Sequence, residues 1–377
     1  MSASIVYHIN HLNWKGVSLH HSTATETEFG TLDNGDIVKR IKLANESGMS
    51  VGIITYGASL QSVCVPDRYG VFADVAAGYA TLDDYLRKPQ YFGSTVGRVA
   101  NRLAKARFTL NGKDYVVSAN DGSNSLHGGA RGFDKVNWTV THRSDRSVTM
   151  QYVSPDGDQG YPGTLTVGAT YALGADNELS VHYRATTDAT TLVNLSNHVY
   201  WNLGGEGAAY SAMGHRLTIH ADHFLPVDSE LIPTGEMRHV EDSLFDFRMG
   251  KVIGDDVGRM DDEQLGFGLG YDHNWVVGDE VAAAPRPVAK LIDPRSGRAM
   301  TLLSNQPGLQ FYSGNFFDGT TRGKAGKSYC RGDAIALEPQ QFPDAPNQPG
   351  FGSIALQPGQ TYSNMIIWRF ELSEERS

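Results

Sequence analysis

Residues 165–185 read LTVGATYALGADNELSVHYRA, and this stretch gives the clearest indication of the fold class. Apolar residues occupy every second position from 165 to 171, and the same alternation resumes from 179 to 185. A period of two is typical of a β-strand that buries one face. The intervening GADNE supplies the glycine, aspartate and asparagine that favour a turn. The stretch therefore predicts two strands joined by a turn and facing an apolar core.

Similar strand pairs occur along the rest of the chain. Residues 108–117 place Asn111-Gly112 between alternating apolar residues, and Asn-Gly tolerates the positive φ angles of a type I′ turn. The other predicted strands are 138–142 with 148–152, 289–292 with 300–302, and the terminal 362–370. Helical periodicity is confined to TLDDYLRK at 81–88, after a Thr81 cap. Many strands and few helices predict an all-β protein, a large antiparallel β-sandwich or barrel with few short helices.

Composition limits the partners and the organisation of the chain. The 377 residues include 42 Asp and Glu against 32 Lys and Arg, so the net charge is −10. This excess of negative charge disfavours nucleic acid as a binding partner. A hydrophobic fraction of 40% with 20% charged residues is typical of a globular chain. No change in composition marks a boundary, so we expect a single domain over residues 1–377, whose N-terminal segment of about 40 residues has no assigned role.

The two cysteines, Cys64 and Cys330, are too few and too far apart for a disulfide framework. Residues 1–16 lack the features of a signal peptide, and no run approaches the roughly 18 apolar residues of a membrane span. We therefore expect a soluble, cytoplasmic protein without a membrane partner. The spacing of His215, His220 and His223 matches no metal motif, and no phosphate-binding glycine motif occurs, so we expect neither a metal nor another cofactor.

Two polar clusters lie in glycine-rich sequence. GRVANR at 97–102 offers two guanidinium groups and an amide, although on its own it fits a surface loop with solvated arginines. NSLHGG at 124–129 has two glycines after His127, which permit a tight turn and leave the imidazole accessible. A turn histidine without a role is an equally good interpretation of that second cluster.

Two further clusters interrupt strand-like sequence. NLSNHVYWN at 194–202 holds several amides around His198, and unpaired buried polar groups cost about 1–3 kcal/mol each, so a surface facing water or a ligand explains them better than a core. AIALEPQ at 334–340 ends an apolar run in Glu338, where partial burial would raise the carboxyl pKa and suit it to act as a base. A Glu338 side chain that points into water is the competing interpretation.

Carboxylates and amides also lie between aromatic residues. Asp272 occurs in YDHNW at 271–275, and Gln310 occurs in LQFY at 309–312. Such side chains suit sugar hydroxyls and the apolar face of a sugar ring, although each segment alone also fits ordinary strand packing.

Together these segments resemble the aldose 1-epimerase family, the galactose mutarotases, in composition, order and spacing. The segments are GRVANR, NSLHGG, NLSNHVYWNL, YDHNW, GLQFYSGN at 308–315 and LEPQQFPDAPNQP at 337–349, and the resemblance runs from about Gly57 to Phe370. Gln341 departs from it, because a histidine often follows the glutamine there. This departure affects no catalytic role.

The resemblance implies the fold, reaction and site of that family. It implies a galactose mutarotase-like β-sandwich with an open cleft, and cofactor-free interconversion of the α and β anomers of free aldoses such as galactose and glucose. By similarity, Glu338 is the general base and His198 the general acid. The implied sugar-binding residues are Asn101, Arg102, His127, Asp272 and Gln310.

Three alternatives remain open at this point. A sugar-binding or regulatory protein would keep the cleft without turnover. A glycoside hydrolase would need two carboxylates, for which Glu338 and Asp272 are the candidates. A hexose-6-phosphate 1-epimerase would need cations for the phosphate, which Arg98 and Arg102 could supply. The preferred aldose, the pathway and the choice between monomer and homodimer are not visible in the sequence.

Overall fold

The computed structural model of the protein describes residues 24–374. The segment 1–16, in which no signal peptide is expected, lies outside the described residues. Within 24–374 no helix is long and apolar enough to cross a membrane.

A nine-stranded antiparallel sheet forms one layer of the molecule. Its order is β11-β12-β13-β14-β30-β24-β23-β18-β21, with the 165–185 hairpin as β13 and β14. Its strands are β11 Thr139–Ser144, β12 Ser147–Ser154, β13 Leu165–Leu173, β14 Glu178–Thr187, β18 Arg216–Ile219, β21 Lys251–Val252, β23 Arg286–Ile292, β24 Arg298–Ser304 and β30 Tyr362–Leu372.

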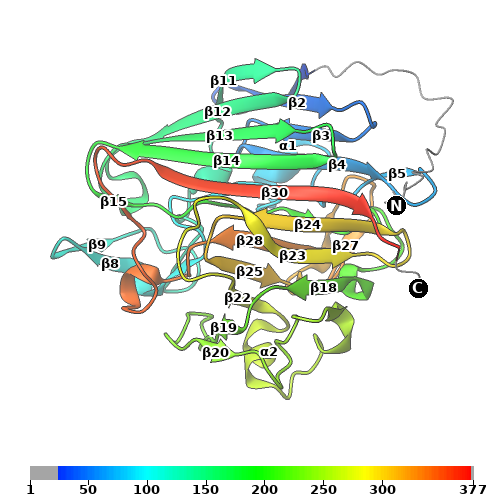
Figure 1. Ribbon diagram of the computed structural model, residues 1–377. Coiled ribbons are helices and arrows are strands. Elements are labelled where there is room, and N and C mark those ends of the chain that lie inside the picture. The colour runs from blue at the N-terminus through cyan, green and yellow to red at the C-terminus, as the bar shows by residue number, and fades with distance from the viewer. Residues whose placement is uncertain (1–23, 375–377) are drawn as a thin grey trace, which may run out of the picture.

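A six-stranded antiparallel sheet forms the facing layer, in the order β17-β28-β25-β22-β19-β20. Its strands are β17 Tyr200–Trp201, β19 His223–Leu225, β20 Arg238–His239, β22 Asp272–Val276, β25 Gly308–Tyr312 and β28 Ile335–Gln340. Figure 1 shows β28, β25 and β22 behind β24 and β23. Trp201 of β17 meets Trp368 and Phe370 of β30 edge-on, with ring centroids 5.8 and 5.6 Å apart. The apolar core between the two sheets confirms the predicted sandwich.

A five-stranded sheet and several ribbons complete the described structure. The sheet runs β1 Thr25–Thr31, β2 Ile37–Ala44, β3 Ser50–Ile54, β4 Ser59–Pro66 and β5 Phe72–Asp74, which gives part of the unassigned N-terminal segment a place in the fold. The ribbon strands are β6 Thr95–Val96 with β16 Ser196–Asn197, β7 Arg102–Leu103 with β10 Ser125–Leu126, β8 Arg107–Leu110 with β9 Lys113–Val116, β15 Thr191–Leu192 with β29 Ala355–Leu356, and β26 Asp318–Arg322 with β27 Ser328–Cys330.

Helices are few and short, as predicted. The α-helices are α1 Leu82–Arg87, which begins after the Thr81 cap, and α2 Glu263–Gly268. The 3-10 helices are η1 Ala104–Ala106, η2 Phe133–Lys135, η3 Asp158–Gly160, η4 Ala212–Gly214, η5 Ile253–Asp255 and η6 Ala345–Asn347.

The local sequence patterns correspond to the observed strands. Leu165, Val167, Ala169 and Tyr171 of β13 are fully buried, and the residues between them are half-buried. Asn111 and Gly112 adopt φ angles of 52° and 74°, so the predicted type I′ geometry between β8 and β9 is confirmed. The two other predicted strand pairs are confirmed, because β11 pairs with β12 and β23 pairs with β24. The predicted terminal strand is β30, which pairs with both β14 and β24.

Candidate active site

The six-stranded sheet places polar side chains in register on the face that points away from the core. Asn274 of β22 pairs with Gln310 of β25, which in turn pairs with Glu338 of β28. Two residues away on the same strands, and therefore on the same face, Asp272 pairs with Tyr312. Because side chains alternate along a strand, the residues between them point into the apolar core instead. Strand alternation therefore gathers residues distant in sequence on one surface.

His198 reaches this surface from the loop between β16 and β17. Its backbone N–H donates to Ser94 O at 2.9 Å, and its carbonyl accepts from Gly93 N–H at 3.0 Å. Its Nε2 lies 3.6 Å from Glu338 Oε1. The structure therefore brings the predicted acid and base together.

Two irregular loops form the opposite wall of the site. Asn101 and His127 adopt left-handed φ angles of 63° and 52°, and their backbones are linked by the His127 N–H, which donates to Asn101 O at 3.1 Å. A side chain on Gly128 would meet Gly97 O at 1.9 Å, so this turn requires glycine. The close approach of the backbone therefore explains the glycine that follows His127.

The protonation form of His127 follows from one hydrogen bond. The Asn101 backbone N–H donates to His127 Nδ1 at 3.1 Å, so Nδ1 is an acceptor and the ring proton is on Nε2. Burial lowers the pKa of His127 well below its usual value, with His198 and Arg102 acting in the same direction. His127 is therefore a neutral donor toward the cleft.

The same hydrogen bond bears on metal binding. Among the described residues, His127, His198 and Glu338 place potential ligand atoms within 4.8 Å of one another. Coordination through His127 Nε2 would need the proton on Nδ1, opposite the Asn101 N–H donor. Filling this cluster with a metal would therefore break the hydrogen bond that holds the turn.

Burial dominates the electrostatics of the predicted acid and base. Glu338 is 2% exposed, and its Oε2 has no hydrogen-bond partner in the structure. Desolvation raises the pKa of Glu338 well above its usual value, with Asp272 adding to the rise and Arg102 opposing it. Desolvation also lowers the pKa of His198 to about 4. Burial therefore disfavours the charged form of both groups.

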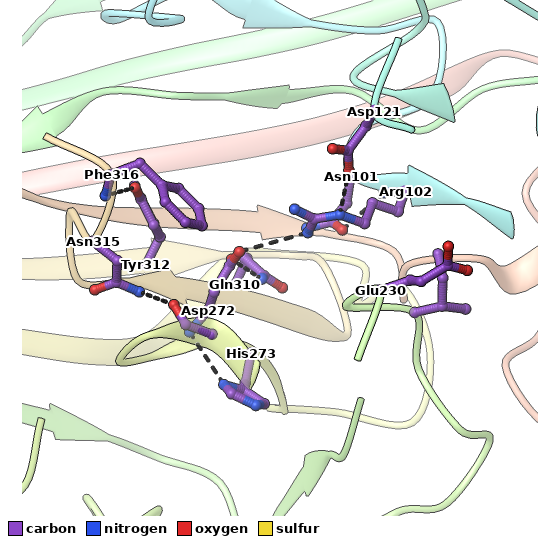
Figure 2. Close-up of polar contacts among 12 residues, drawn as sticks. Asn101, Arg102, Asp121, Glu230, Asp272, His273, Gln310, Tyr312, Asn315 and Phe316 are labelled. Carbon is purple, nitrogen blue, oxygen red and sulfur yellow. Dashed lines mark hydrogen bonds and ion pairs between the residues drawn. The ribbon is translucent and has the colours of Figure 1, made fainter. Parts of the chain in front are cut away.

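A polar network joins Arg102, Asp121, Asp272 and Gln310 (Figure 2). Arg102 Nε lies 2.8 Å from Asp121 Oδ2, and its Nη1 lies 3.5 Å from Asp272 Oδ2. Gln310 Nε2 donates to Asp272 Oδ1 at 2.8 Å, and Asn274 Nδ2 donates to Gln310 Oε1 at 3.4 Å. Burial alone would lower the pKa of Arg102, but Asp272 and Asp121 outweigh it and raise the value. The guanidinium is therefore held charged and oriented at the cleft.

Arg98 behaves differently from Arg102. It is 2% exposed, and its terminal nitrogens donate to carbonyl or hydroxyl oxygens of residues 154, 155, 162, 163 and 191. The interpretation of GRVANR as a loop with solvated arginines is wrong for both residues, since Arg102 is only 7% exposed. The reason is that tertiary contacts supply enough acceptors to replace water.

An open cleft of about 550 Å³ lies over these groups. It is lined by the predicted residues Asn101, Arg102, His127, His198, Asp272 and Glu338, and by Gln90, Tyr91, Leu126, Tyr200, Tyr312 and Phe316. The predicted Gln310 is not among the lining residues, and its Nε2 donates to Asp272 Oδ1.

Sequence reasoning missed the aromatic part of this lining. Tyr200 and Tyr312 stand two residues after His198 and Gln310, so strand alternation was a signal that would have found them. Tyr91 and Phe316 have no such signal, because irregular segments place them.

Comparison with known proteins agrees with the fold. The family model described as aldose 1-epimerase matches residues 39–368. The galactose mutarotase of Rattus norvegicus is 43% identical over 352 residues, which cover 93% of this chain and 99% of that protein. The aldose 1-epimerase of Escherichia coli is 36% identical over 345 residues, which cover 89% of this chain and 96% of that protein.

Solved structures show the same architecture. The galactose 1-epimerase of Lactobacillus acidophilus has a TM-score of 0.81 at 29% identity and covers 93% of this chain and 99% of its own. The aldose epimerase homologue of C. elegans has a TM-score of 0.80 at 31% identity, with 89% of this chain and all of its own covered. From the extent of the family match and the identity to these relatives, the chain belongs to the aldose 1-epimerase family.

Proposed function

We propose that this protein is an aldose 1-epimerase, which interconverts the α and β anomers of free aldoses such as galactose and glucose. The observation that carries the proposal is the pairing of Glu338 and His198 at 3.6 Å, both buried, on the floor of an open polar cleft. Ring opening requires one group that removes a proton and another that supplies one, on the two oxygens bonded to the same carbon.

The proposed ring-opening step conserves protons and electrons. Glu338, as carboxylate, takes the proton from the hydroxyl on C1, and the freed electron pair forms the C1 carbonyl. The bond from C1 to the ring oxygen breaks, and that oxygen receives the proton of the His198 imidazolium. The aldehyde turns about its C1–C2 bond, and the reverse proton transfers close the ring on the other face.

The pKa directions fit this sequence of events. Burial disfavours both the Glu338 carboxylate and the His198 imidazolium. Ring opening consumes both charges and leaves a neutral pair, which is the form that the buried site favours. Desolvation therefore favours the step that opens the ring.

The remaining site residues have proposed roles in holding the sugar. Asn101, the charged Arg102 and the Nε2–H of His127 offer hydrogen-bond donors, and the carboxylate of Asp272 offers an acceptor. Gln310 holds the Asp272 carboxylate at 2.8 Å, which supports a role through that residue. The fixed hydroxyls would contribute orientation to the rate.

The alternatives have weaker support from the same contacts. Arg98 is committed to protein oxygens and Arg102 lies between two carboxylates, so neither supports binding of a sugar phosphate. The Asp272 carboxyl group is occupied by contacts with Arg102 and Gln310, which argues against a role as the acid of a hydrolase. A binding protein without turnover would not need the desolvated Glu338 and His198 pair.

We further propose a single domain, a cytoplasmic location, and a monomer or homodimer whose partner is the small sugar alone. The net charge of −10 supports the absence of nucleic acid among its partners. Cys64 and Cys330 are both free thiols, which supports a reducing compartment.

Polarimetry tests the proposed activity. Crystalline α-D-galactose is dissolved in buffer, and the decay of optical rotation is compared with purified protein, without protein, and with Glu338→Gln. We expect acceleration by the wild type and loss of most of it in the variant. Failure of the wild type to accelerate mutarotation of either galactose or α-D-glucose would contradict the proposal, and a sugar titration would then test the binding-protein alternative.

A further inference from the structure

One aromatic ring of the cleft contacts both histidines. The Tyr91 ring stacks on the His198 imidazole, with centroids 5.6 Å apart and planes inclined by 26°. It also meets the His127 ring at 4.7 Å, and the two histidine rings are 5.1 Å apart. These separations lie in the range of favourable ring contacts. The three rings therefore form one cluster around the proposed acid.

The backbone around Tyr91 is bound to the backbone of His198. The His198 carbonyl accepts from Gly93 N–H, and the His198 N–H donates to Ser94 O. The Ser94 N–H in turn donates to Tyr91 O at 3.1 Å. A side chain on Gly93 would meet Leu60 O at 2.0 Å, so this segment is fixed against the sheet. The position of the tyrosine ring is thus coupled to that of the imidazole.

Tyr91 occupies an unfavourable backbone conformation. Its φ angle is +59°, in the left-handed region that residues other than glycine rarely adopt. The following Phe92 is 1% exposed and fixed in an aromatic cluster, which supplies contacts that offset the strain. The conformation turns the Tyr91 side chain into the cleft, away from the side on which Phe92 is buried.

We propose that Tyr91 is a positioning residue for His198. The face of the Tyr91 ring orients the His198 imidazole and stabilises the imidazolium form before His198 gives a proton to the sugar. This inference rests on the proposed function, which assigns the acid role to His198. Tyr91 acts through His198 and belongs to none of the motifs that carry the family resemblance.

The groups around His198 explain why an aromatic face matters there. Glu338 faces it from β28 at 3.6 Å, Tyr200 from β17 at a ring distance of 4.8 Å, and His127 from the loop after β10. The charged Arg102 also lines the cleft and disfavours a second cation. Lys135 Nζ lies 5.8 Å from the centroid of the Tyr91 ring, a second cation near the same cluster. Apart from Glu338, the stacked Tyr91 ring is the group among these whose π face attracts an imidazolium.

Tyr91 is the better residue to test. Tyr200 is 4% exposed, so its truncation would leave a buried cavity, whereas Tyr91 is partly exposed at the cleft. Tyr91→Phe keeps the π face and removes only the hydroxyl. Tyr91→Leu and Tyr91→Met keep apolar bulk and remove the π face. Tyr69→Leu, in the exposed turn between β4 and β5, is a control for loss of a tyrosine.

The experiment measures kcat and KM for α-D-galactose by polarimetry, and the His198 pKa by NMR of the imidazole nitrogens. We expect Tyr91→Leu and Tyr91→Met to lower kcat about tenfold, with a smaller change in KM and a lower His198 pKa. Tyr91→Phe should stay within about twofold of the wild-type kcat, and Tyr69→Leu should match the wild type. Thermal unfolding establishes that each variant is folded.

The outcomes separate this inference from the proposed function. An inactive wild type overturns the proposed function and the acid role on which the inference rests. An active wild type whose folded Tyr91→Leu or Tyr91→Met variant keeps its kcat and His198 pKa overturns the inference alone. A loss of kcat in Tyr91→Phe equal to that in Tyr91→Leu also overturns it, because the hydroxyl would then be the important group.

Discussion

The central strands of the two facing sheets bury their residues in different ways. In β13 and β14, buried apolar residues alternate with half-buried or exposed residues that are mostly polar, so one face is core and the other meets solvent. In β25 and β28 every residue is buried, although Gln310, Glu338 and Gln340 are polar. Burying polar groups without full pairing costs free energy, so the second pattern needs a functional reason.

Polar residues on strands that are buried on both faces therefore indicate the candidate site more directly than any single motif does. The nine-stranded sheet contributes free energy of folding through area removed from water. The six-stranded sheet carries reactive groups whose pKa values depend on that same exclusion of water. Four sets of substitutions test this contrast.

The largest expected effect is on activity when the proposed acid is removed. His198→Asn should lower kcat by about 10²–10⁴-fold, because the ring oxygen loses its proton donor. The wild-type kcat/KM should fall as the pH drops below about 4, because His198 is then protonated in addition to Glu338 and the base is lost. That acidic limb should be absent from the residual activity of the variant.

His182 is the matched control for this substitution. It lies on the outer face of β14, where its Nε2 is 2.9 Å from Ser363 Oγ. His182→Asn should keep the wild-type kcat and pH profile. A His198→Asn variant within tenfold of the wild type would contradict the acid role and would remove the contrast between the sheets.

The second effect is on stability. Leu179 of β14 is fully buried, and Leu179→Ala should lower the free energy of unfolding by about 3 kcal/mol while leaving kcat unchanged. Leu337→Ala, beside Glu338 on β28, should cost a similar amount and also lower kcat, because the base would lose its rigid support. Urea unfolding and polarimetry check both variants, and equal effects on kcat would remove the distinction between the sheets.

The third effect concerns the carboxylate next to the pair. Asp272→Asn should lower kcat/KM about 10–100-fold, because a charge-assisted contact to Arg102 is lost. The Asp272 charge raises the pKa of Glu338, so its removal should lower that pKa and move the alkaline limb of kcat/KM to lower pH.

Asp121→Asn provides a matched control, since Asp121 is the other carboxylate partner of Arg102. Its side chain is 38% exposed and it is not a cause of the Glu338 shift, so the alkaline limb should stay in place. An Asp272→Asn profile that superimposes on that of Asp121→Asn would show that Asp272 does not tune the base.

The smallest effect is expected on the solvent face of the nine-stranded sheet. Arg369 Nη2 lies 2.9 Å from Glu178 Oε2, with both side chains at least one-third exposed. Arg369→Ala should change the free energy of unfolding by less than about 1 kcal/mol and leave kcat unchanged. A larger loss, measured by urea unfolding, would show that this face also contributes an organised polar network.

The sequence by itself determined the elements whose causes are local. The alternation in 165–185, the Asn111-Gly112 turn and the Thr81 cap each depend on neighbouring residues, so β13 and β14, the β8–β9 turn and α1 could be predicted. The candidate residues could also be named, because polar side chains in apolar strands are visible as letters. Their roles came from a resemblance that spans most of the chain.

Only the tertiary structure decided which of those residues meet and in what chemical state. Glu338 and His198 belong to segments far apart in the chain, and the pairing of β17, which follows His198, with β28 brings the two side chains within 3.6 Å. The pKa directions of this pair, the tautomer of His127 and the burial of Arg98 all depend on atoms contributed by distant segments. Water exclusion and hydrogen-bond partners are properties of the packed molecule, which is why no local pattern predicted the placement of Tyr91 over the acid.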